Sequence, residues 1–169
     1  MVIWITGMSS AGKTTVGSEL CRLWREEESG TVHVDGDVVR WIFDSEQGRP
    51  LAHTMEGRRT NCDRIVRLCE ALDSQGLNVV CCILCIFNDV VIANRERFSA
   101  YYHVDLSASW DSLRARDKKG LYTGGQWDVA GIDQPCADPA LADIQFITDA
   151  SESPHDIART ILKQIGGRT

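Results

Sequence analysis

Eight residues near the start of the chain have the types and the spacing of a phosphate-binding loop. The pattern G-x-x-x-x-G-K-[ST] is matched by Gly7-Met8-Ser9-Ser10-Ala11-Gly12-Lys13-Thr14. In such a loop, glycines let successive backbone N–H groups point at a phosphate, and the lysine reaches the β- and γ-phosphates. The hydroxyl of Thr14 can ligate Mg²⁺, and the helix that follows turns its positive end toward the same anion. The pattern predicts that the chain binds a nucleoside triphosphate.

Two carboxylates and a guanidinium group follow the second apolar run of the chain. Asp35 and Asp37 flank Gly36 directly after this run, and Arg40 stands one helical turn later. Carboxylates at a strand end beside a phosphate loop suit Mg²⁺ with its waters and the activation of an acceptor hydroxyl. Solvated acids in a turn are the alternative. The preceding loop favours a catalytic pair, with Asp35 and Thr14 at the metal.

A second basic group recurs at a spacing of three at the start of an expected helix. Its members are Arg58, Asn61 and Arg64. Arginines so arranged can hold a substrate phosphate through paired hydrogen bonds. A solvated basic face is the alternative, because Arg59 and Arg67 are close in sequence.

A third basic stretch, Arg116-Asp117-Lys118-Lys119-Gly120, ends another expected helix. A cation there would close over the triphosphate and neutralise charge during transfer. The alternative is an ordinary helix C-terminus, where cations and a glycine cap are favoured without any ligand.

Alternating strands and helices must position these groups. Apolar runs predict five strands, at Val2–Thr6, Thr31–Val34, Leu77–Phe87, Tyr102–Leu106 and Ile144–Thr148,. Helical patterns separate them, and Ser153 with Pro154 predicts the start of the last helix. This alternation predicts an α/β fold, a three-layer α/β/α sandwich with a five-stranded parallel sheet, in a single domain over residues 1–169. Residues 118–143 lack periodicity and predict a lid loop.

Composition restricts the partners and the compartment. A net charge of -6 argues against a nucleic-acid partner but leaves room for a small anionic substrate,. No apolar run is long enough to span a membrane, and the N-terminus has no signal-peptide pattern. Seven cysteines, with Cys81, Cys82 and Cys85 inside one apolar run, predict buried free thiols rather than disulfides or metal ligands,. We therefore expect a cytoplasmic protein.

These motifs, in their order along the chain, resemble the adenylyl-sulfate kinases. The resemblance covers nearly the whole chain and rests on GMSSAGKTT, DGDVVR, R-x-x-N-x-x-R, RDKKGLY and AGIDQPCADP. It implies a P-loop α/β fold, Mg²⁺ with ATP as co-substrate, and phosphorylation of the 3′-hydroxyl of adenylyl sulfate under a mobile lid. It implies that Lys13, Asp35 and Asp37 are catalytic. The implied ATP-binding residues are Gly7, Ser9, Ser10, Ala11, Gly12, Lys13, Thr14, Thr15 and Arg116.

The same resemblance implies an acceptor site that departs from the family pattern. Its expected members are Arg40, His53, Arg58, Asn61, Cys85, Ile86, Phe87, Lys119 and Leu121. His53 and Val129 stand where the family has the two phenylalanines that sandwich the acceptor adenine, and Leu84-Cys85-Ile86 replaces I-S-P. Phe87-Asn88-Asp89 instead resembles a divergent branch that includes kinases acting on cytidine diphosphoramidate.

The sequence thus predicts that the ATP-binding half of the site keeps the family pattern and that the acceptor-binding half departs from it. Trp127 or Trp41 would restore one stacking ring, unless each packs in the lid or the core,. The expected partners are ATP and a small nucleotide, without nucleic acid or membrane, and a homodimer is compatible with the sequence. The alternative is an ATP-binding regulatory domain that is catalytically idle, which the altered acceptor motifs favour and the complete set of donor-site residues disfavours.

Overall fold

The central strand β1 (Val2–Gly7) lies between two neighbouring strands and is buried over nearly its whole length. The computed structural model describes residues 1–44, 54–84, 86–117, 136–149 and 152–166. Its sheet has the order β2-β3-β1-β4-β5, and every neighbouring pair is parallel. The other strands are β2 (Thr31–Asp35), β3 (Asn78–Cys82), β4 (Tyr101–Ser107) and β5 (Ile144–Ile147).

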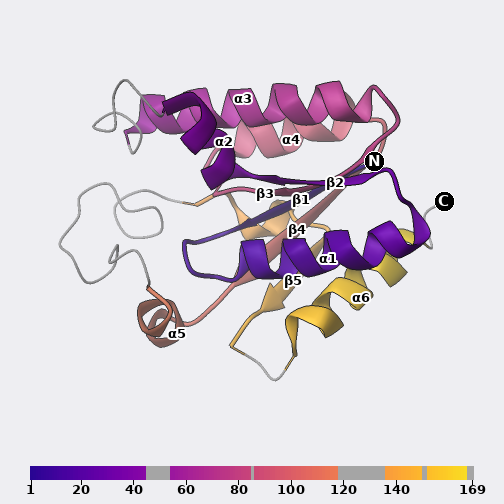
Figure 1. Cartoon of the computed structure of the whole chain (residues 1–169). Helices are drawn as coiled ribbons and strands as arrows, with labels where there is room; N and C mark the ends of the chain where they lie inside the picture. Colours follow the sequence, from indigo (N-terminus) through magenta and orange to yellow (C-terminus); the bar gives the residue numbers. More distant parts are fainter. Residues whose placement is uncertain (45–53, 85, 118–135, 150–151, 167–169) are drawn as a thin grey trace.

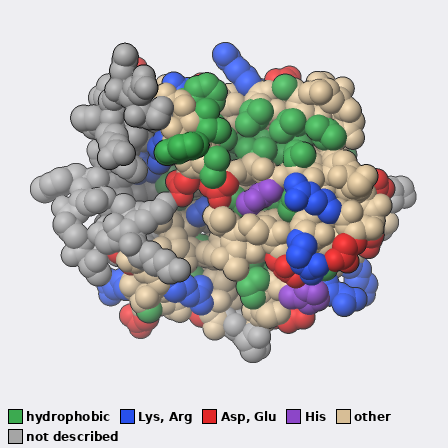
Figure 2. Space-filling view, viewed as in Figure 1, with side chains coloured by type: hydrophobic (Ala, Val, Ile, Leu, Met, Phe, Trp, Pro, Cys, Tyr) green, Lys and Arg blue, Asp and Glu red, His purple; other side chains and the backbone are tan. Residues whose placement is uncertain are grey.

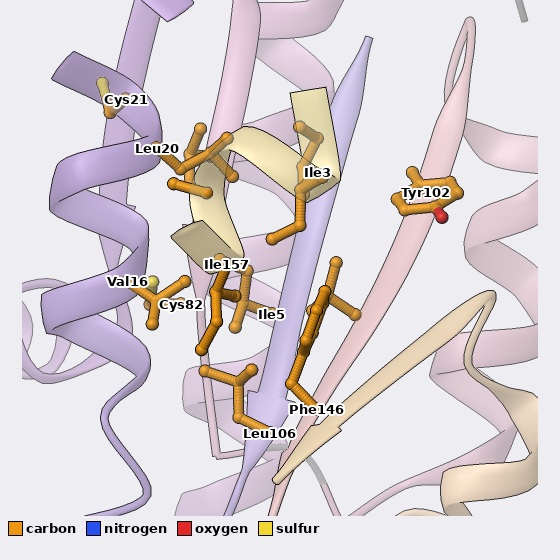
Figure 3. Packing of buried hydrophobic residues seen from close by; sticks show 14 of the residues in the cluster. Ile3, Ile5, Val16, Leu20, Cys21, Cys82, Tyr102, Leu106, Phe146 and Ile157 are labelled. Atoms are coloured by element: carbon orange, nitrogen blue, oxygen red, sulfur yellow. The ribbon is translucent and has the colours of Figure 1, made fainter. Parts of the chain in front are cut away.

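Helices cover both faces of this sheet (Figure 1). Side chains of β1 alternate between the two layers, as they must in a strand. Ile3 and Ile5 pack with α1 (Lys13–Glu27) and α6 (Pro154–Gly166), a cluster that Figure 3 shows from close by. Val2 and Trp4 pack on the other side. That layer holds α3 (Met55–Asp73) and α4 (Asn88–Arg97), and α2 (Gly36–Asp44) lies against α3. This is the predicted three-layer α/β/α sandwich.

Side chains cap the helices where the sequence supplies hydroxyl groups. The Ser153 hydroxyl accepts a hydrogen bond from Asp156 N at 3.2 Å and donates to the Asp156 carboxylate at 2.7 Å, so the predicted start of α6 is confirmed. Thr54 caps α3, and Ser109 caps α5 (Trp110–Ala115). A side-chain oxygen at the cap satisfies an N–H group that has no partner inside the helix.

One predicted strand, Leu77–Phe87, is too long. β3 ends at Cys82, opposite Ile5 of β1. Beyond this pair, Ile83 N still donates to Ile5 O at 3.0 Å, but Thr6 and Gly7 of β1 pair with β4 instead, and β2 ends at Asp35, opposite Cys82. The apolar run stays buried beyond the end of the strand. The hydrophobic pattern alone therefore cannot show where the strand ends. The other four strands are confirmed within one residue at each end.

Cys81 and Cys82 are buried in β3, as predicted, and the six cysteines within the described ranges are free. Cys85 and residues 118–135 of the expected lid lie outside the described residues. The rest of that stretch includes the short 3-10 helix η1 (Pro139–Leu141). Within the described ranges, none of the helices combines the length and the apolar character needed to cross a bilayer.

Candidate functional site

The predicted phosphate loop forms a tight cradle between β1 and α1. Gly7 and Gly12 have φ angles of 144° and 91°, and Ser10 adopts a φ of 64° that side chains other than glycine rarely adopt,. A Cβ atom on Gly7 would run into the backbone oxygen of Leu106 in β4. Ala11 N closes the turn by donating to Met8 O at 3.2 Å. The loop therefore leads directly into the N-terminus of α1, where anions are favoured.

The two residues that begin α1 make short polar contacts. The ammonium group of Lys13 donates to Met8 O at 2.7 Å, and so lies across the cradle. The hydroxyl of Thr14 donates to the Asp35 carboxylate at 2.7 Å, and Asp37 N donates to the other oxygen of this carboxylate at 2.8 Å. One carboxylate therefore joins the start of α1 to the start of α2. The structure brings together Lys13, Thr14, Asp35 and Asp37 as the sequence predicted.

The chemistry of this junction fits Mg²⁺. A hydroxyl and a carboxylate are hard oxygen donors, and Mg²⁺ in kinases takes one or two protein ligands, with waters and substrate phosphates in the remaining positions. Thr14 and Asp35 are such a pair. In the described part of the chain, no group of three or more His, Cys, Asp or Glu side chains is placed to hold a metal ion. The pair Thr14 and Asp35 leaves the remaining positions of such an ion to waters and to the phosphates of a nucleotide.

A thiol in the neighbouring strand β3 fixes the position of α1, and the sequence analysis missed it. Cys82 Sγ donates to Lys13 O at 3.2 Å, and burial raises the pKa of this thiol, which keeps it protonated,. A Cβ atom on Gly17 would collide with Cys82 Sγ. The glycine inside α1 is the signal in the sequence, because an interior helical glycine usually has a packing reason.

Arg58 and Asn61 of α3 are buried, at 9% and 4% exposure, so a solvated basic face does not describe them. The amide group of Asn61 donates to Gly36 O at 3.2 Å, and this bond holds α3 against the start of α2. Arg64, in contrast, lies over the Phe43 ring at 4.9 Å from its centroid. Two members of the predicted basic group are thus buried, with Asn61 bonded between Asp35 and Asp37 at Gly36, and the third lies against an exposed aromatic ring.

Two polar atoms in this region are buried without a hydrogen-bond partner among the described residues. They are Asn61 Oδ1 and Arg40 Nε. A buried polar atom that lacks a partner costs about 1–3 kcal/mol. A polar ligand that reached these atoms would recover that free energy. Arg40 and Asn61, both expected to contact the acceptor, therefore each have a buried polar atom whose bonding is incomplete.

Another expected contact group follows β3 at the same edge of the sheet. Ile86 is buried, and Phe87 immediately precedes α4. The Arg59 guanidinium lies 5.0 Å from the centroid of the Phe87 ring and pairs with Asp89 at 2.8 Å. The sequence analysis named Arg59 only in support of the alternative of a solvated basic face, and it missed this arrangement. The cue was the Phe87-Asn88-Asp89 stretch itself.

Of the remaining residues expected at the site, some lie in the described part of the chain and others lie outside it. Arg116 follows α5 and donates to Thr148 Oγ1 and O at 3.2 and 3.0 Å, beyond the end of β5. Trp41 is 72% exposed, so it is not a core residue. It belongs to an apolar surface on α2 and α3, where Figure 2 shows hydrophobic side chains gathered. The predicted residues outside the described ranges are His53, Cys85, Lys119, Leu121, Trp127 and Val129.

Comparison with known proteins gives a consistent result. Residues 1–147 match the family model described as adenylylsulphate kinase. The chain is 30% identical over 122 residues to cytidine diphosphoramidate kinase of Campylobacter jejuni, covering 72% of this chain and 69% of that protein. It is 28% identical over 172 residues to adenylyl-sulfate kinase of Gloeothece citriformis, with 98% and 96% of the two chains covered.

A solved structure has the same fold. The APS kinase CysC of Mycobacterium tuberculosis, determined in complex with AMPPNP and APS, superposes with a TM-score of 0.80 at 22% identity. The match covers 98% of this chain and 96% of that one. The predicted fold class is thereby confirmed.

Proposed function

Because the chain belongs to the adenylylsulphate kinase family and is an ATP-dependent phosphotransferase, we propose that it phosphorylates the ribose 3′-hydroxyl of a small nucleotide. The acceptor carries a mixed-anhydride tail, as in adenylyl sulfate or cytidine diphosphoramidate. The phosphate comes from the γ position of Mg-ATP. The observation that carries this proposal is the junction where Thr14 and the Asp37 backbone share the Asp35 carboxylate, directly beside Lys13.

The residues of the donor side have distinct roles in this proposal. The backbone N–H groups of the cradle and Lys13 bind the β- and γ-phosphates, and they spread the charge that develops during transfer. Thr14 and Asp35 hold Mg²⁺, which neutralises charge on the phosphates when it is bound. Lys13 exchanges its contact with Met8 O for phosphate oxygens. Catalysis here is positioning and charge neutralisation, which suits a site with few groups capable of covalent chemistry.

The acceptor side supplies a base and an anchor. Asp37 is exposed at the start of α2, next to the metal junction, and it orients or deprotonates the ribose hydroxyl,. Arg58 and Asn61 hold the nucleotide from the buried face of α3, where Asn61 Oδ1 has bonding capacity left. Charge-assisted contacts from an arginine of this kind suit a phosphate or sulfate tail.

The test is an acceptor assay that includes both candidate nucleotides. The purified chain is given Mg-ATP with adenylyl sulfate or with cytidine diphosphoramidate, and ADP release is followed while mass spectrometry identifies the product. We expect turnover with one of them, and none with the matching 3′-deoxy nucleotide. Turnover of the 3′-deoxy analogue would place the phosphate elsewhere. ATP binding without turnover of any nucleotide would instead support the idle regulatory domain.

Substitution of one carboxylate tests the role of Asp37 separately. Asp37→Asn keeps the backbone N–H that binds Asp35 but removes the charge, so we expect turnover to fall by about 10²-fold or more while ATP still binds,. Asp111→Asn, at an exposed position in the first turn of α5, is the matched control. Equal activity of the two variants would remove Asp37 from the mechanism.

We further propose that the enzyme works in the cytoplasm and on small molecules alone. Free thiols at all six described cysteines are what a reducing compartment allows,. The net charge of -6 disfavours a polynucleotide acceptor,. Whether the chain forms a homodimer is decided by light scattering after size-exclusion chromatography, with and without the ATP analogue.

A further inference from the structure

A short polar chain in the interior of the sheet ends at the root of the phosphate cradle. Thr6 is the last residue of β1 before Gly7, and it pairs in register with Asp105 of β4. Its hydroxyl lies 2.9 Å from Asp105 Oδ1 and 2.8 Å from His103 Nε2. The three side chains are buried, with exposures of 2% for Thr6, 0% for His103 and 7% for Asp105. None of them belongs to the motifs that predicted the active site.

The chemistry of the hydroxyl fixes the direction of both bonds. A hydroxyl has one proton, and the Asp105 carboxylate can only accept, so Thr6 donates to Asp105. Thr6 therefore accepts from His103, whose ring must hold its proton on Nε2. Nδ1 then keeps a lone pair and meets no partner at hydrogen-bond geometry among the described residues, although the backbone of Leu141 lies close enough to raise the pKa of the ring. Burial lowers the pKa of His103, which favours this neutral ring,.

The backbone of His103 is held as firmly as its ring. His103 N donates to the Asp143 carboxylate, and Asp143 N donates to His103 O, both at 2.8 Å. The Arg95 guanidinium lies 3.3 Å from both oxygens of the same carboxylate and also donates to Leu141 O at 2.7 Å. The imidazole is thus an anchored donor, and the Thr6 hydroxyl depends on it.

The cradle needs such an anchor. Directly after Thr6 the backbone passes so close to Leu106 that only glycine fits, and the loop then holds Ser10 at a positive φ. A loop with strained backbone keeps its shape only when the surrounding structure over-determines it. Thr6 directly precedes this loop, and its hydroxyl contacts β4 at His103 Nε2 and Asp105 Oδ1, and at Val104 O at the longer distance of 3.4 Å.

We infer that His103 is a positioning residue for ATP binding, and that it acts through Thr6 on the shape of the phosphate cradle. His103 touches neither nucleotide. Its Nε2–H saturates the Thr6 hydroxyl, which leaves the Thr6 proton directed at Asp105 and holds the end of β1 in register with β4. This inference rests on the proposed function in one respect, that ATP occupies the cradle.

The test measures affinity for Mg²⁺ with a non-hydrolysable ATP analogue by titration calorimetry. His103→Phe keeps a ring but removes the donor, so we expect the Kd to rise about fivefold, the value of one hydrogen bond. His103→Gln supplies an amide N–H at a similar reach, and we expect it to return the Kd toward that of the wild type. The KM for the acceptor should not change.

Two further variants separate this role from general stability. Val104→Ala creates a cavity in the same strand, on the opposite face of the sheet, and should lower stability with no change in Kd,. Thr6→Val removes the hydroxyl through which His103 acts. In that background His103→Phe should have no further effect on Kd, a coupling that a double-mutant cycle measures.

The outcomes are distinct. Failure of the wild-type chain to bind the analogue would refute the proposed function and this inference with it. Binding by the wild type, together with equal Kd values for His103→Phe and Val104→Ala, would refute the inference alone. So would an undiminished effect of His103→Phe in the Thr6→Val background. Nitrogen NMR of the imidazole supplies a check that needs no variant, because a proton on Nδ1 at neutral pH would contradict the bonding described here.

Discussion

The donor half and the acceptor half of this site differ in how completely their polar groups are bonded. In the donor half, Lys13 donates to Met8 O, and Thr14 and the Asp37 backbone donate to the Asp35 carboxylate, all at 2.7–2.8 Å. In the acceptor half, Arg40 Nε and Asn61 Oδ1 are buried without partners in the described part of the chain. The side chains of the donor half are thus already hydrogen-bonded and must exchange these bonds for bonds to the ligand. The acceptor half has buried polar atoms that have not yet formed hydrogen bonds.

This difference matches what the two halves must recognise. The donor half binds a triphosphate, which is the same in every kinase of the fold, and its loop pattern is complete. The acceptor half must distinguish one nucleotide from others, and its sequence departs from the family pattern. Discrimination of this kind depends on buried polar groups that only the correct ligand satisfies.

Lys13→Ala should abolish the function of the donor half. We expect turnover to fall about a thousandfold or more, because the Lys13 ammonium group lies across the cradle and its loss leaves the charge on the transferred phosphate uncompensated,. The measurement is ADP release with the preferred acceptor. Lys163→Ala, an exposed lysine of α6, is the control. Near-normal turnover in Lys13→Ala, with an unchanged circular dichroism spectrum, would refute the assignment of the cradle as the ATP-binding site.

Arg58→Gln should affect the acceptor half alone. We expect the KM for the acceptor to rise about tenfold or more through loss of a charged contact, while the Kd for the ATP analogue stays the same,. Arg67→Gln is the matched control, since Arg67 belongs to the same helix but is exposed. If Arg58→Gln weakened the binding of the acceptor and of the ATP analogue equally, the donor and acceptor halves would not act independently.

Gly17→Ala should damage the support of the donor half rather than its chemistry. The added Cβ collides with Cys82 Sγ, so we expect a loss of about 1–3 kcal/mol in the free energy of unfolding, measured by urea denaturation,. Adding Cys82→Ala removes the colliding atom and should recover part of this loss. Gly166→Ala, near the end of α6 where a Cβ meets nothing, is the control. A double variant no more stable than Gly17→Ala would rule out this collision as the cause.

Lowering the pH should reduce the free energy of unfolding because His103 becomes protonated. This is the smallest of the expected effects. Burial lowers the pKa of His103 below 6.5, and Arg95 lowers it further, although a hydrogen bond to the Leu141 backbone and the charges of Asp105 and Asp143 raise it. The unfolded chain therefore takes up the proton first, so this contribution to stability is complete above about pH 6.5 and is lost as the pH falls toward the pKa of the folded state.

The loss from His103 at about pH 5.5 is at most about 1.4 kcal/mol, relative to neutral pH. Urea denaturation at the two pH values measures it. His103→Phe should narrow the difference between them by this amount. An unchanged difference would mean that His103 is not the group that titrates.

Much of the fold could be predicted from the sequence because its signals are local. Continuous apolar runs mark strands that are covered on both faces, and Ser153 marks the start of a helix through a contact three residues away,. The exception is instructive. The run from Leu77 to Phe87 is apolar at nearly every position, but β3 stops at Cys82, where its pairing with β1 and with β2 ends. Where a strand ends depends on its pairing with the neighbouring strands, so the sequence of one strand alone does not predict it.

The sequence by itself determined the donor site, since a phosphate loop is a contiguous motif whose residues act on the same ligand through their own backbone. It also established which residue types were available for the acceptor. Only the tertiary structure decided that Arg58 is buried while Arg59 pairs with Asp89, and that Cys82 supports Lys13. It alone joined Thr6 to His103, which are 97 residues apart. Contacts of this kind depend on strand order and register, which bring distant residues together and leave no spacing in the chain to reveal them.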